Sequence, residues 1–405
     1  MSGPTPSARR SRVVLAIGTA QTLAWGSSYY LPAVLADPVS ATLGLSRAWF
    51  FGAFSAALVL MAFFGPAIGR HIDAHGGRRV LIASSLALAA GLVLLAAAQG
   101  PASLVVAWLV LGVAMALGLY ESAFAALTHL YGRGARSPIT GITLMAGFAS
   151  TIGWPATAAM DHAFGWRTAC LVWAAIHLVV TLPCYAFVVP RRAAPVDERG
   201  DDGKAPVAVA AHPPEPANAM LLLGITFAIV AYVSTAMAAH LPRLLQATGT
   251  GAAAAIAAAA LVGPAQVAAR FGEFLTAHRW QPHPVIAARV AAALHPVGAG
   301  VLVTIGGAGA AAPAFALLHG AGNGLLTIAR GTLPLALFGP VGYGYRQGAI
   351  GAAARLAQAV APISFGVLLD AAGATGALAV SAGLSVVGLV ALLALGRTPR
   401  SRAPT

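Results

Sequence analysis

Several charged side chains lie within long apolar stretches of the chain, where charges are uncommon. They are Glu121, Arg270, Glu273, Arg330 and Arg355. A carboxylate in low-dielectric surroundings is a group on which a proton can be loaded and unloaded. The planar fork of an arginine binds a carboxylate or a similar oxyanion through two hydrogen bonds. Charges in such surroundings are costly and usually face a cavity or a partner, so each is a candidate for a site.

Each candidate also has a purely structural explanation. Glu121 is either a proton or substrate site, or a structural bond to an adjacent helix. Arg270 and Glu273 are three residues apart and therefore share a helix face, which favours a structural ion pair. Arg330 and Arg355 could each hold an anion, or each could be paired with a backbone carbonyl or with Glu273. The residue types alone leave these alternatives open.

The composition indicates that lipid surrounds the elements that carry these residues. Of the 405 residues, 59% are hydrophobic and only 9% are charged, and the mean hydropathy is +0.80. Soluble domains contain roughly 25% charged residues. The formal charge of +13 comes from arginines in short clusters between apolar runs, not from one basic face. We therefore expect the lipid bilayer, and not a nucleic acid, as the partner.

The apolar stretches have the length of membrane spans. A span needs about 20 mostly apolar residues, and lipid offers no partner for an unpaired amide, so each span should be helical. We predict an all-α membrane protein with twelve transmembrane helices. They are expected at 13–35, 47–70, 79–98, 102–130, 138–160, 167–189, 219–244, 251–275, 285–305, 311–336, 347–369 and 374–396.

The polar segments between the spans predict the orientation and the division of the chain. Most arginines fall on the side of the N-terminus, whereas Arg47, Arg167 and Arg243 fall on the other. Positive charge marks the inside, so we expect a multi-pass inner-membrane protein with both termini cytoplasmic. The polar segment 190–218 resembles a linker. It divides the chain into two six-helix halves, at 1–189 and 219–405, which repeat weakly, although chance could also produce such matches in alanine-rich sequence.

A local motif lies between the second and third expected spans. The segment GRHIDAHGGRR at 69–79 resembles the signature loop of the major facilitator superfamily in Gly69, Asp73, Gly76, Arg78 and Arg79. Ala74 departs from the basic residue usual there, so the ion pair of that residue is not expected. Gly69 would allow close helix packing, and Asp73 could meet a helix N-terminus or an arginine. We predict a conformational latch; the alternative is an ordinary positive-inside loop.

The resemblance also implies where a substrate would bind. In this family spans 1, 4, 7 and 10 line a central cavity, and the stretch from span 1 into span 2 is similar to that of bacterial monocarboxylate and oxalate/formate members. Some arsenical and drug exporters look similar there. Aromatic candidates could equally be packing or interfacial residues. With the two deeper arginines, the implied substrate-binding candidates are Gln21, Trp25, Tyr29, Tyr120, Tyr232, His240, Asn323, Arg330 and Arg355.

These observations predict a secondary transporter that works by alternating access. The charges inside the second half are net positive, which favours an organic anion such as a monocarboxylate, and Glu121 is the candidate for proton coupling. The alternative within the fold is a drug or arsenical exporter. A membrane enzyme would need clustered catalytic groups, and a sensor or scaffold usually carries a soluble domain. We expect a monomer that is not an enzyme and that needs no cofactor or metal, since the signature loop explains Asp73 between His71 and His75.

Overall fold

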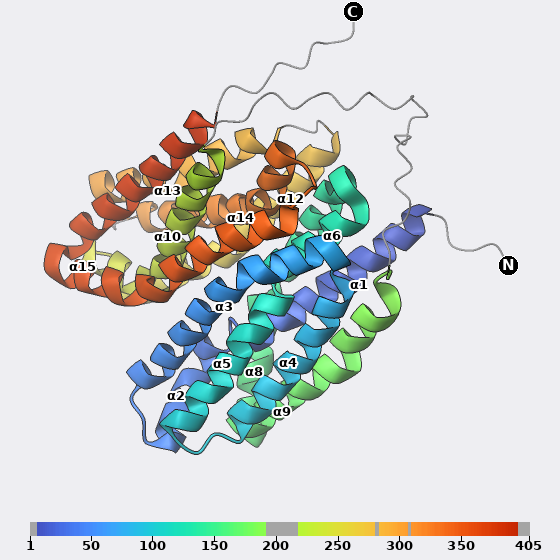
Figure 1. The fold of residues 1–405 in the computed structure, drawn as a ribbon. Helices are drawn as coiled ribbons and strands as arrows, with labels where there is room; N and C mark the ends of the chain where they lie inside the picture. The colour runs from blue at the N-terminus through green and yellow to red at the C-terminus, as the bar shows by residue number, and fades with distance from the viewer. Residues whose placement is uncertain (1–5, 192–217, 280–282, 307–308, 396–405) are drawn as a thin grey trace, which may run out of the picture.

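The computed structural model describes residues 6–191, 218–279, 283–306 and 309–395, and all regular structure in these ranges is helical (Figure 1). The expected all-helical fold is therefore confirmed. In chain order the helices are α1 (Pro6–Ser27), α2 (Pro32–Leu43), α3 (Arg47–His75), α4 (Arg78–Ala96), α5 (Pro101–Gly118), α6 (Tyr120–Tyr131), α7 (Arg136–Ala146), α8 (Ala149–Phe164), α9 (Trp166–Ile176), α10 (Ala219–Ala247), α11 (Ala252–Ala260), α12 (Val262–Arg279), α13 (Pro284–Ile305), α14 (Ala311–Phe338) and α15 (Tyr343–Ala394). Short helical turns of other types follow α6 and α9, at Gly132–Ala135, His177–Thr181 and Cys184–Val188.

Long apolar helices dominate the described residues. Eight helical stretches there have the length and apolarity of a membrane span, and two of them, Pro101–Phe164 and Tyr343–Ala394, contain 64 and 52 residues. The second of these turns at Gly373, whose φ of 66° is open to glycine but strained for other residues. The spans expected at 347–369 and 374–396 lie on either side of this turn.

Four of the expected spans are interrupted between two α-helices. The span at 13–35 consists of α1 and α2, that at 102–130 of α5 and α6, that at 138–160 of α7 and α8, and that at 251–275 of α11 and α12. At the second break Leu119 is extended (φ −81°, ψ −169°), which leaves carbonyls of α5 without helical partners. The hydroxyl of Ser122 donates to the Ala116 carbonyl at 2.7 Å, and the Gln21 amide donates to the Gly118 carbonyl. The break is thus stabilised by side chains, as non-helical backbone inside a membrane requires.

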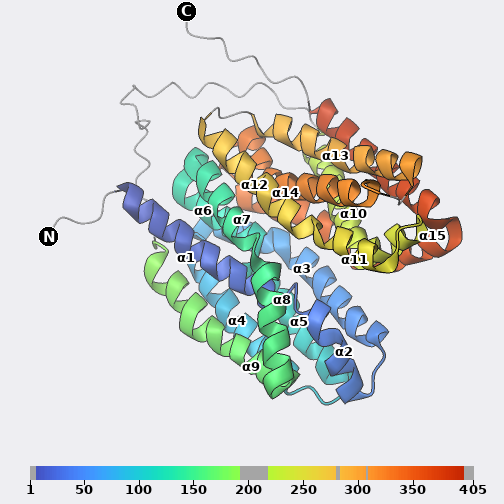
Figure 2. The ribbon, with the colours of Figure 1, turned by 180° about the vertical axis from the view of Figure 1, so that it is seen from behind.

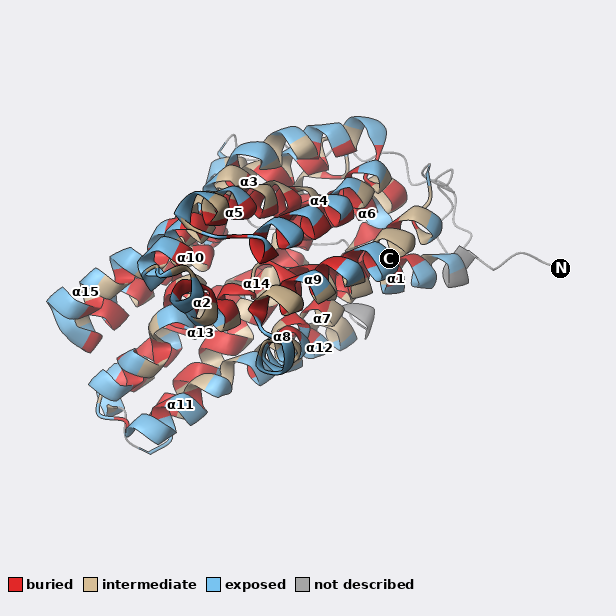
Figure 3. Ribbon diagram, turned by 90° about the horizontal axis from the view of Figure 1, so that it is seen from below, coloured by how far each residue is buried: buried red, intermediate tan, exposed pale blue. Residues whose placement is uncertain are grey.

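The buried apolar side chains form separate cores for the earlier and the later helices. One core draws almost entirely on residues 13–189, and two others on residues 219–395. Figures 1 and 2 show α1–α9 and α10–α15 as two adjacent groups, called here the N-terminal and C-terminal helices. Figure 3 shows buried residues facing neighbouring helices and exposed ones facing outward. The outward residues include Phe63 (75% exposed) and Phe187 (87% exposed), as expected for a surface in lipid.

The two groups meet mainly through α3 with α15, α6 with α14 and α15, and α7 with α12 and α14. On α3, an added Cβ at Gly69 would lie 2.0 Å from the Gly344 carbonyl oxygen, and at Gly65 it would lie 3.3 Å from that of Gly348. The backbones of α3 and α15 therefore touch, which only glycine permits. This contact lies where α3 ends and α15 begins, and we call this side of the molecule the Asp73 end.

Candidate functional site

The break between α5 and α6 places Glu121 at the beginning of a helix. Glu121 is the second residue of α6, within its first turn, and its side chain is only 9% exposed. The positive end of the helix dipole favours a carboxylate at this position. A continuous helix through 102–130 would have given Glu121 no such end, so the interruption itself prepares the site for a negative charge.

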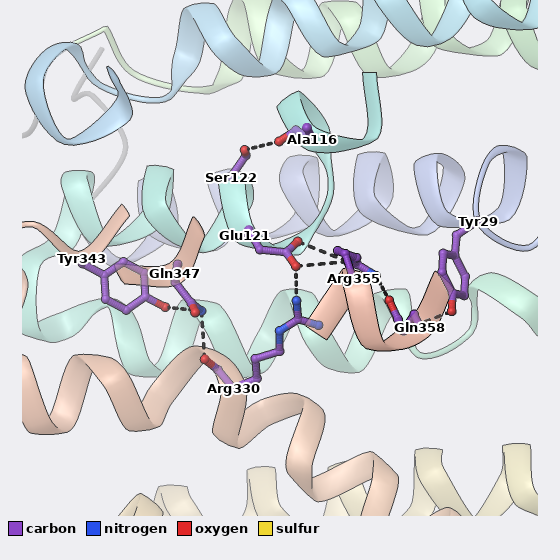
Figure 4. A network of polar contacts seen from close by, with 9 residues as sticks. All are labelled: Tyr29, Ala116, Glu121, Ser122, Arg330, Tyr343, Gln347, Arg355 and Gln358. Atoms are coloured by element: carbon purple, nitrogen blue, oxygen red, sulfur yellow. Dashed lines mark hydrogen bonds and ion pairs between the residues drawn. The ribbon is translucent and has the colours of Figure 1, made fainter. Parts of the chain in front are cut away.

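Two arginines from the C-terminal helices converge on Glu121 (Figure 4). Arg330 of α14 donates through Nη2 to Glu121 Oε1, and Nη2 of Arg355 on α15 lies 3.1 Å from Oε1 and 3.3 Å from Oε2. The side chains of Arg330 and Arg355 are 13% and 1% exposed. The carboxylate is therefore buried between two guanidinium groups, and it replaces Glu273 as the partner of these arginines. It also links the N-terminal to the C-terminal helices.

The ion pairs continue into a longer hydrogen-bonded network (Figure 4). Arg355 Nη1 donates to Gln358 Oε1 at 2.7 Å, and Gln358 Nε2 donates to the Tyr29 hydroxyl at 3.1 Å. On the other side, Gln347 Nε2 donates to the Arg330 carbonyl at 2.9 Å. The glutamines thus hold both arginine-bearing segments in position, and Gln358 makes a second bridge to the N-terminal helices.

Aromatic rings border the arginine pair. The guanidinium of Arg355 lies over the rings of Trp25 and Tyr29, at 5.4 and 5.8 Å from their centroids. Trp25 also contacts Tyr30 and Tyr120, with centroid distances of 5.9 and 4.8 Å. Contacts of this kind attract a cation to the face of an aromatic ring. They keep Arg355 at the wall of the site without using its hydrogen-bond donors.

Two donors in this region lack a hydrogen-bond partner within the part of the chain that the structure describes. They are the indole Nε1 of Trp25 and the Nε of Arg355, and both atoms are buried. A buried donor without an acceptor costs about 1–3 kcal/mol. In the same network Gln347 Oε1 is a buried acceptor without a partner among the described residues. The unpaired donors outnumber the unpaired acceptors there, which suits a ligand rich in acceptor atoms.

Arg270 of α12 is a third buried arginine, 6% exposed. Among the described residues its hydrogen bonds all go to neutral acceptors: the carbonyls of Gly324 and Thr143, Gln266 Oε1 and Thr327 Oγ1, at 3.3–3.4 Å. It lies near enough to Tyr30 and Tyr120 to interact electrostatically with both. The expected pairing with Glu273 is not what the structure has, since Glu273 interacts with Arg136 instead.

The signature-loop residues lie at the Asp73 end. Asp73 was expected to meet either a helix N-terminus or an arginine, and in the structure it meets the N-terminus of α15. The Oδ1 and Oδ2 atoms of Asp73 accept from the backbone N–H groups of Gly344 and Tyr345, at 2.7 and 2.9 Å. Arg78 Nη2 donates to the Ala186 carbonyl. Asp73 therefore connects α3 directly to the first turn of α15, beside the Gly69–Gly344 contact.

Comparison with known proteins identifies the family. A family model described as the Major Facilitator Superfamily matches residues 17–316, about three quarters of the chain. The chain belongs to the major facilitator superfamily. It is thus a multi-pass membrane protein of a family of transporters, not of enzymes. A search of curated proteins gave no match.

Solved structures of other superfamily members share the fold. The chain is similar to the human organic anion transporter MFSD10 (TETRAN), with 18% identity and a TM-score of 0.72 over 96% of this chain and 100% of that one. It is also similar to the E. coli fucose:proton symporter FucP, with 14% identity and a TM-score of 0.68 over 95% and 98% of the two chains. A structure of FucP in the outward conformation gives 15% and 0.70 over 95% and 99%. At these identities the likeness extends to the fold alone.

The structure brings only some of the candidates from the superfamily resemblance together. Trp25, Tyr29, Tyr120, Arg330 and Arg355 surround Glu121, as described above. Four others lie elsewhere. Gln21 is buried among the N-terminal helices, Tyr232 and His240 hydrogen-bond to Ser364 and Pro362 of α15, and Asn323 borders a small cavity within the C-terminal helices.

The sequence did not indicate Gln347 or Gln358 as site residues, and it favoured Arg270 as half of a structural ion pair. Gln358 lies three residues after Arg355 and on the same helix face, a spacing that could have identified it. Gln347 reaches Arg330 from another helix, and nothing in the sequence indicates that contact.

Proposed function

We propose that this superfamily member is a secondary active transporter of a small organic anion, such as a monocarboxylate. It would work by alternating access, with twelve spans in two six-helix halves, at 1–189 and 219–405, and with both termini on the cytoplasmic side of the inner membrane. The separate cores of the N-terminal and C-terminal helices support the two halves. The linker expected at 190–218 lies almost wholly outside the described residues.

The substrate class rests on the balance of charge and donors between the two groups of helices. Glu121 faces Arg330 and Arg355, so one negative charge is shared between two positive ones, while Arg270 has only neutral acceptors among the described residues. The unpaired donors of Trp25 and Arg355 add to this excess. A carboxylate would supply both the charge and the acceptor atoms that these groups lack. The excess of buried cations and donors is the observation that carries the proposal.

The closed contact at the Asp73 end fits an outward-facing state. The arginine-rich loops support placing this end at the cytoplasm, and there Asp73 and the paired glycines of α3 and α15 hold the two groups together. Helices α6 and α7 also contact the C-terminal helices, and both lie on the Asp73 side of the breaks at Leu119 and Gly147. Substrate would then enter from the outside, and release inside would require this contact to open. We accordingly retain the latch role for residues 69–79.

Proton coupling is assigned to Glu121 as part of the proposal. A proton on this carboxylate would remove the negative charge between Arg330 and Arg355 and free their donors for substrate. A substrate carboxylate could then take the place of Glu121 at Arg355. Coupling would follow because the proton binds Glu121, the carboxylate that competes with the anion for the same two arginines.

The proposal is tested by transport of acetate, lactate and oxalate in proteoliposomes. Arg270→Gln should lower the apparent affinity for the transported anion by about 10- to 150-fold, as expected for loss of one hydrogen bond to a charged group. Arg355→Lys, which keeps the charge but loses the fork, should also weaken it. Arg243→Gln is the matched control, since this arginine is exposed and paired with Asp370. Wild-type affinity in folded Arg270→Gln and Arg355→Lys would refute the anion site.

One observation favours a second candidate, a drug or arsenical exporter of the same fold. Glu121 already compensates part of the charge of the arginines, and four aromatic rings stand beside it. Such a wall suits flat neutral or cationic compounds. Transport of hydrophobic cations or arsenite, with no transport of the three anions, would favour this candidate.

A further inference from the structure

A second polar site lies within the C-terminal helices. A cavity of about 30 Å³ is bordered by α10, α13, α14 and α15, which is room for one or two water molecules. Most of its lining is apolar. Its polar members are Thr226, Ser234, His295, His319, Asn323 and Ser385. Both histidine side chains are buried, with 6% and 5% exposure.

The two histidines form a hydrogen-bonded chain. Nδ1 of His295 lies 3.0 Å from Nδ1 of His319, and Nε2 of His295 lies 3.1 Å from the hydroxyl oxygen of Ser381. That hydroxyl donates its one hydrogen to the Leu378 carbonyl at 3.0 Å. Each of these contacts needs one hydrogen, so the hydrogen bonds all run in one donor-to-acceptor direction.

The hydrogen bonds determine which nitrogen carries the hydrogen in each neutral ring. Because Ser381 donates to Leu378, Nε2 of His295 must carry the hydrogen that Ser381 accepts. Nδ1 of neutral His295 then has a lone pair and accepts from Nδ1–H of His319. Nε2 of His319 is left with a lone pair and with no hydrogen-bond partner among the described residues. The chain therefore ends in one free basic nitrogen on a ring that borders the cavity.

The groups around His319 include no fixed positive charge. None of the residues lining the cavity is charged, so no fixed cation repels a proton there. The ring of Phe315 stacks on His319 with centroids 6.0 Å apart and an interplanar angle of 11°, and it lies 5.5 Å from His295. Aromatic faces stabilise a nearby cation. Asn323 and the hydroxyl groups of Thr226, Ser234 and Ser385 line the same cavity.

Helix α14 connects this site to the arginines. His319, Asn323 and Thr327 are spaced by four and share one helix face. Thr327 donates to the Asn323 carbonyl at 2.8 Å and accepts from Arg270 Nη2 at 3.3 Å. His319 and Thr327 are eight residues apart, which is roughly 12 Å along the helix. Arg270 of α12 thus contacts the helix that carries both His319 and Arg330, the partner of Glu121.

We propose that the His295–His319 pair is a proton-binding site, separate from Glu121. The proton is transferred from a hydronium in the cavity to the lone pair on Nε2 of His319, which leaves water behind and forms an imidazolium. The Nδ1–H of His319 continues to donate to His295. The claim that this proton is coupled to transport rests on the proposed function, whereas the binding of the proton does not.

Proton binding is tested on the full chain in lipid nanodiscs with ¹⁵N-labelled histidine. Solid-state NMR from about pH 8 to about pH 4 spans the usual titration of histidine. We expect Nε2 of His319 to be unprotonated at neutral pH and protonated at the acid end, with the Nδ1–Nδ1 hydrogen bond present throughout. Signals are assigned by their loss in His295→Gln and His319→Gln. Ser381→Ala, which keeps both rings, supplies the assignment where a ring variant does not fold.

Coupling is tested in proteoliposomes by comparing lactate accumulation driven by a pH gradient with lactate exchange at equal pH. His319→Gln should lower the ratio of the two rates at least tenfold. The matched control is His177→Gln, since His177 is an equally buried single ring bonded to the hydroxyls of Ser27 and Thr181.

Two results would overturn the inference. One is an Nε2 of His319 that keeps one protonation state over the whole range, and the other is a folded His319→Gln that retains the wild-type ratio. Absence of transport of lactate, acetate and oxalate by the wild type would instead refute the proposed function. The NMR titration would still decide whether the pair binds a proton.

Discussion

Replacing Gly69 by alanine should open the Asp73 end of the molecule. The new Cβ would lie 2.0 Å from the carbonyl oxygen of Gly344 and 2.3 Å from its carbonyl carbon, whereas real Cβ contacts are essentially never under 3.0 Å. Helices α3 and α15 must therefore separate by about 1 Å or more, because the opposing atoms are backbone and have no other rotamer.

The size of the effect follows from this overlap. Overpacking of this kind costs about 1–3 kcal/mol. Only the state in which α3 and α15 touch bears that cost, so the ratio of closed to open molecules should fall by about 5- to 150-fold. Gly52→Ala is the matched control, since Gly52 is on the same helix and its Cβ would meet nothing within 4 Å. It should leave the ratio unchanged.

The measurement is the distance between spin labels at Ala74 and Val341, two exposed positions at the Asp73 end. Double electron–electron resonance in nanodiscs should give one short distance in the wild type and in Gly52→Ala. Gly69→Ala should add a longer distance. A folded Gly69→Ala protein with the wild-type distance distribution would show that the glycine crossing does not control the closed state.

Three further variants test other parts of the structure. Asp73→Asn removes the charge at the N-terminus of α15, worth about 0.3–1 kcal/mol, and should slow turnover with little change in affinity; a large affinity loss at normal turnover would contradict the latch. Glu121→Gln should abolish accumulation driven by a pH gradient but retain exchange, because an amide cannot carry the proton; unchanged accumulation would exclude Glu121 from coupling. Single cysteines at positions 200 and 400 should resist an impermeant thiol reagent in intact cells, and labelling of either would overturn the topology.

The helices could be predicted from the sequence, but their interruptions could not. Hydropathy locates spans because membrane thickness fixes the length of an apolar run. It does not register backbone angles, so the extended Leu119 inside the run LGLYESAF was not visible. That break matters for the site, since it turns Glu121 from a mid-helix residue into the beginning of α6.

The sequence identified the charged residues of the site but did not show which of them pair with one another. Arg330 and Arg355 were expected to hold an anion or to pair with a carbonyl or with Glu273, and their partner in the structure is Glu121, which lies 209 and 234 residues away in the sequence. The expected partner of Arg270 was Glu273, three residues on, yet a shared helix face does not fix where two side chains point. His295 and His319 escaped notice because pairing across two helices leaves no local pattern.

The long sequence separation within the Glu121 cluster has a consequence for synthesis. Chains elongate at about 5–20 residues per second, so Arg330 follows Glu121 by roughly 10–40 s. For that interval the nascent N-terminal helices hold a carboxylate in the bilayer without its counter-charges, which is costly even where the start of a helix favours a negative charge. A chain cut before Arg330 should therefore be recognised as incomplete by membrane quality control and degraded. Glu121→Gln should lengthen the lifetime of that fragment.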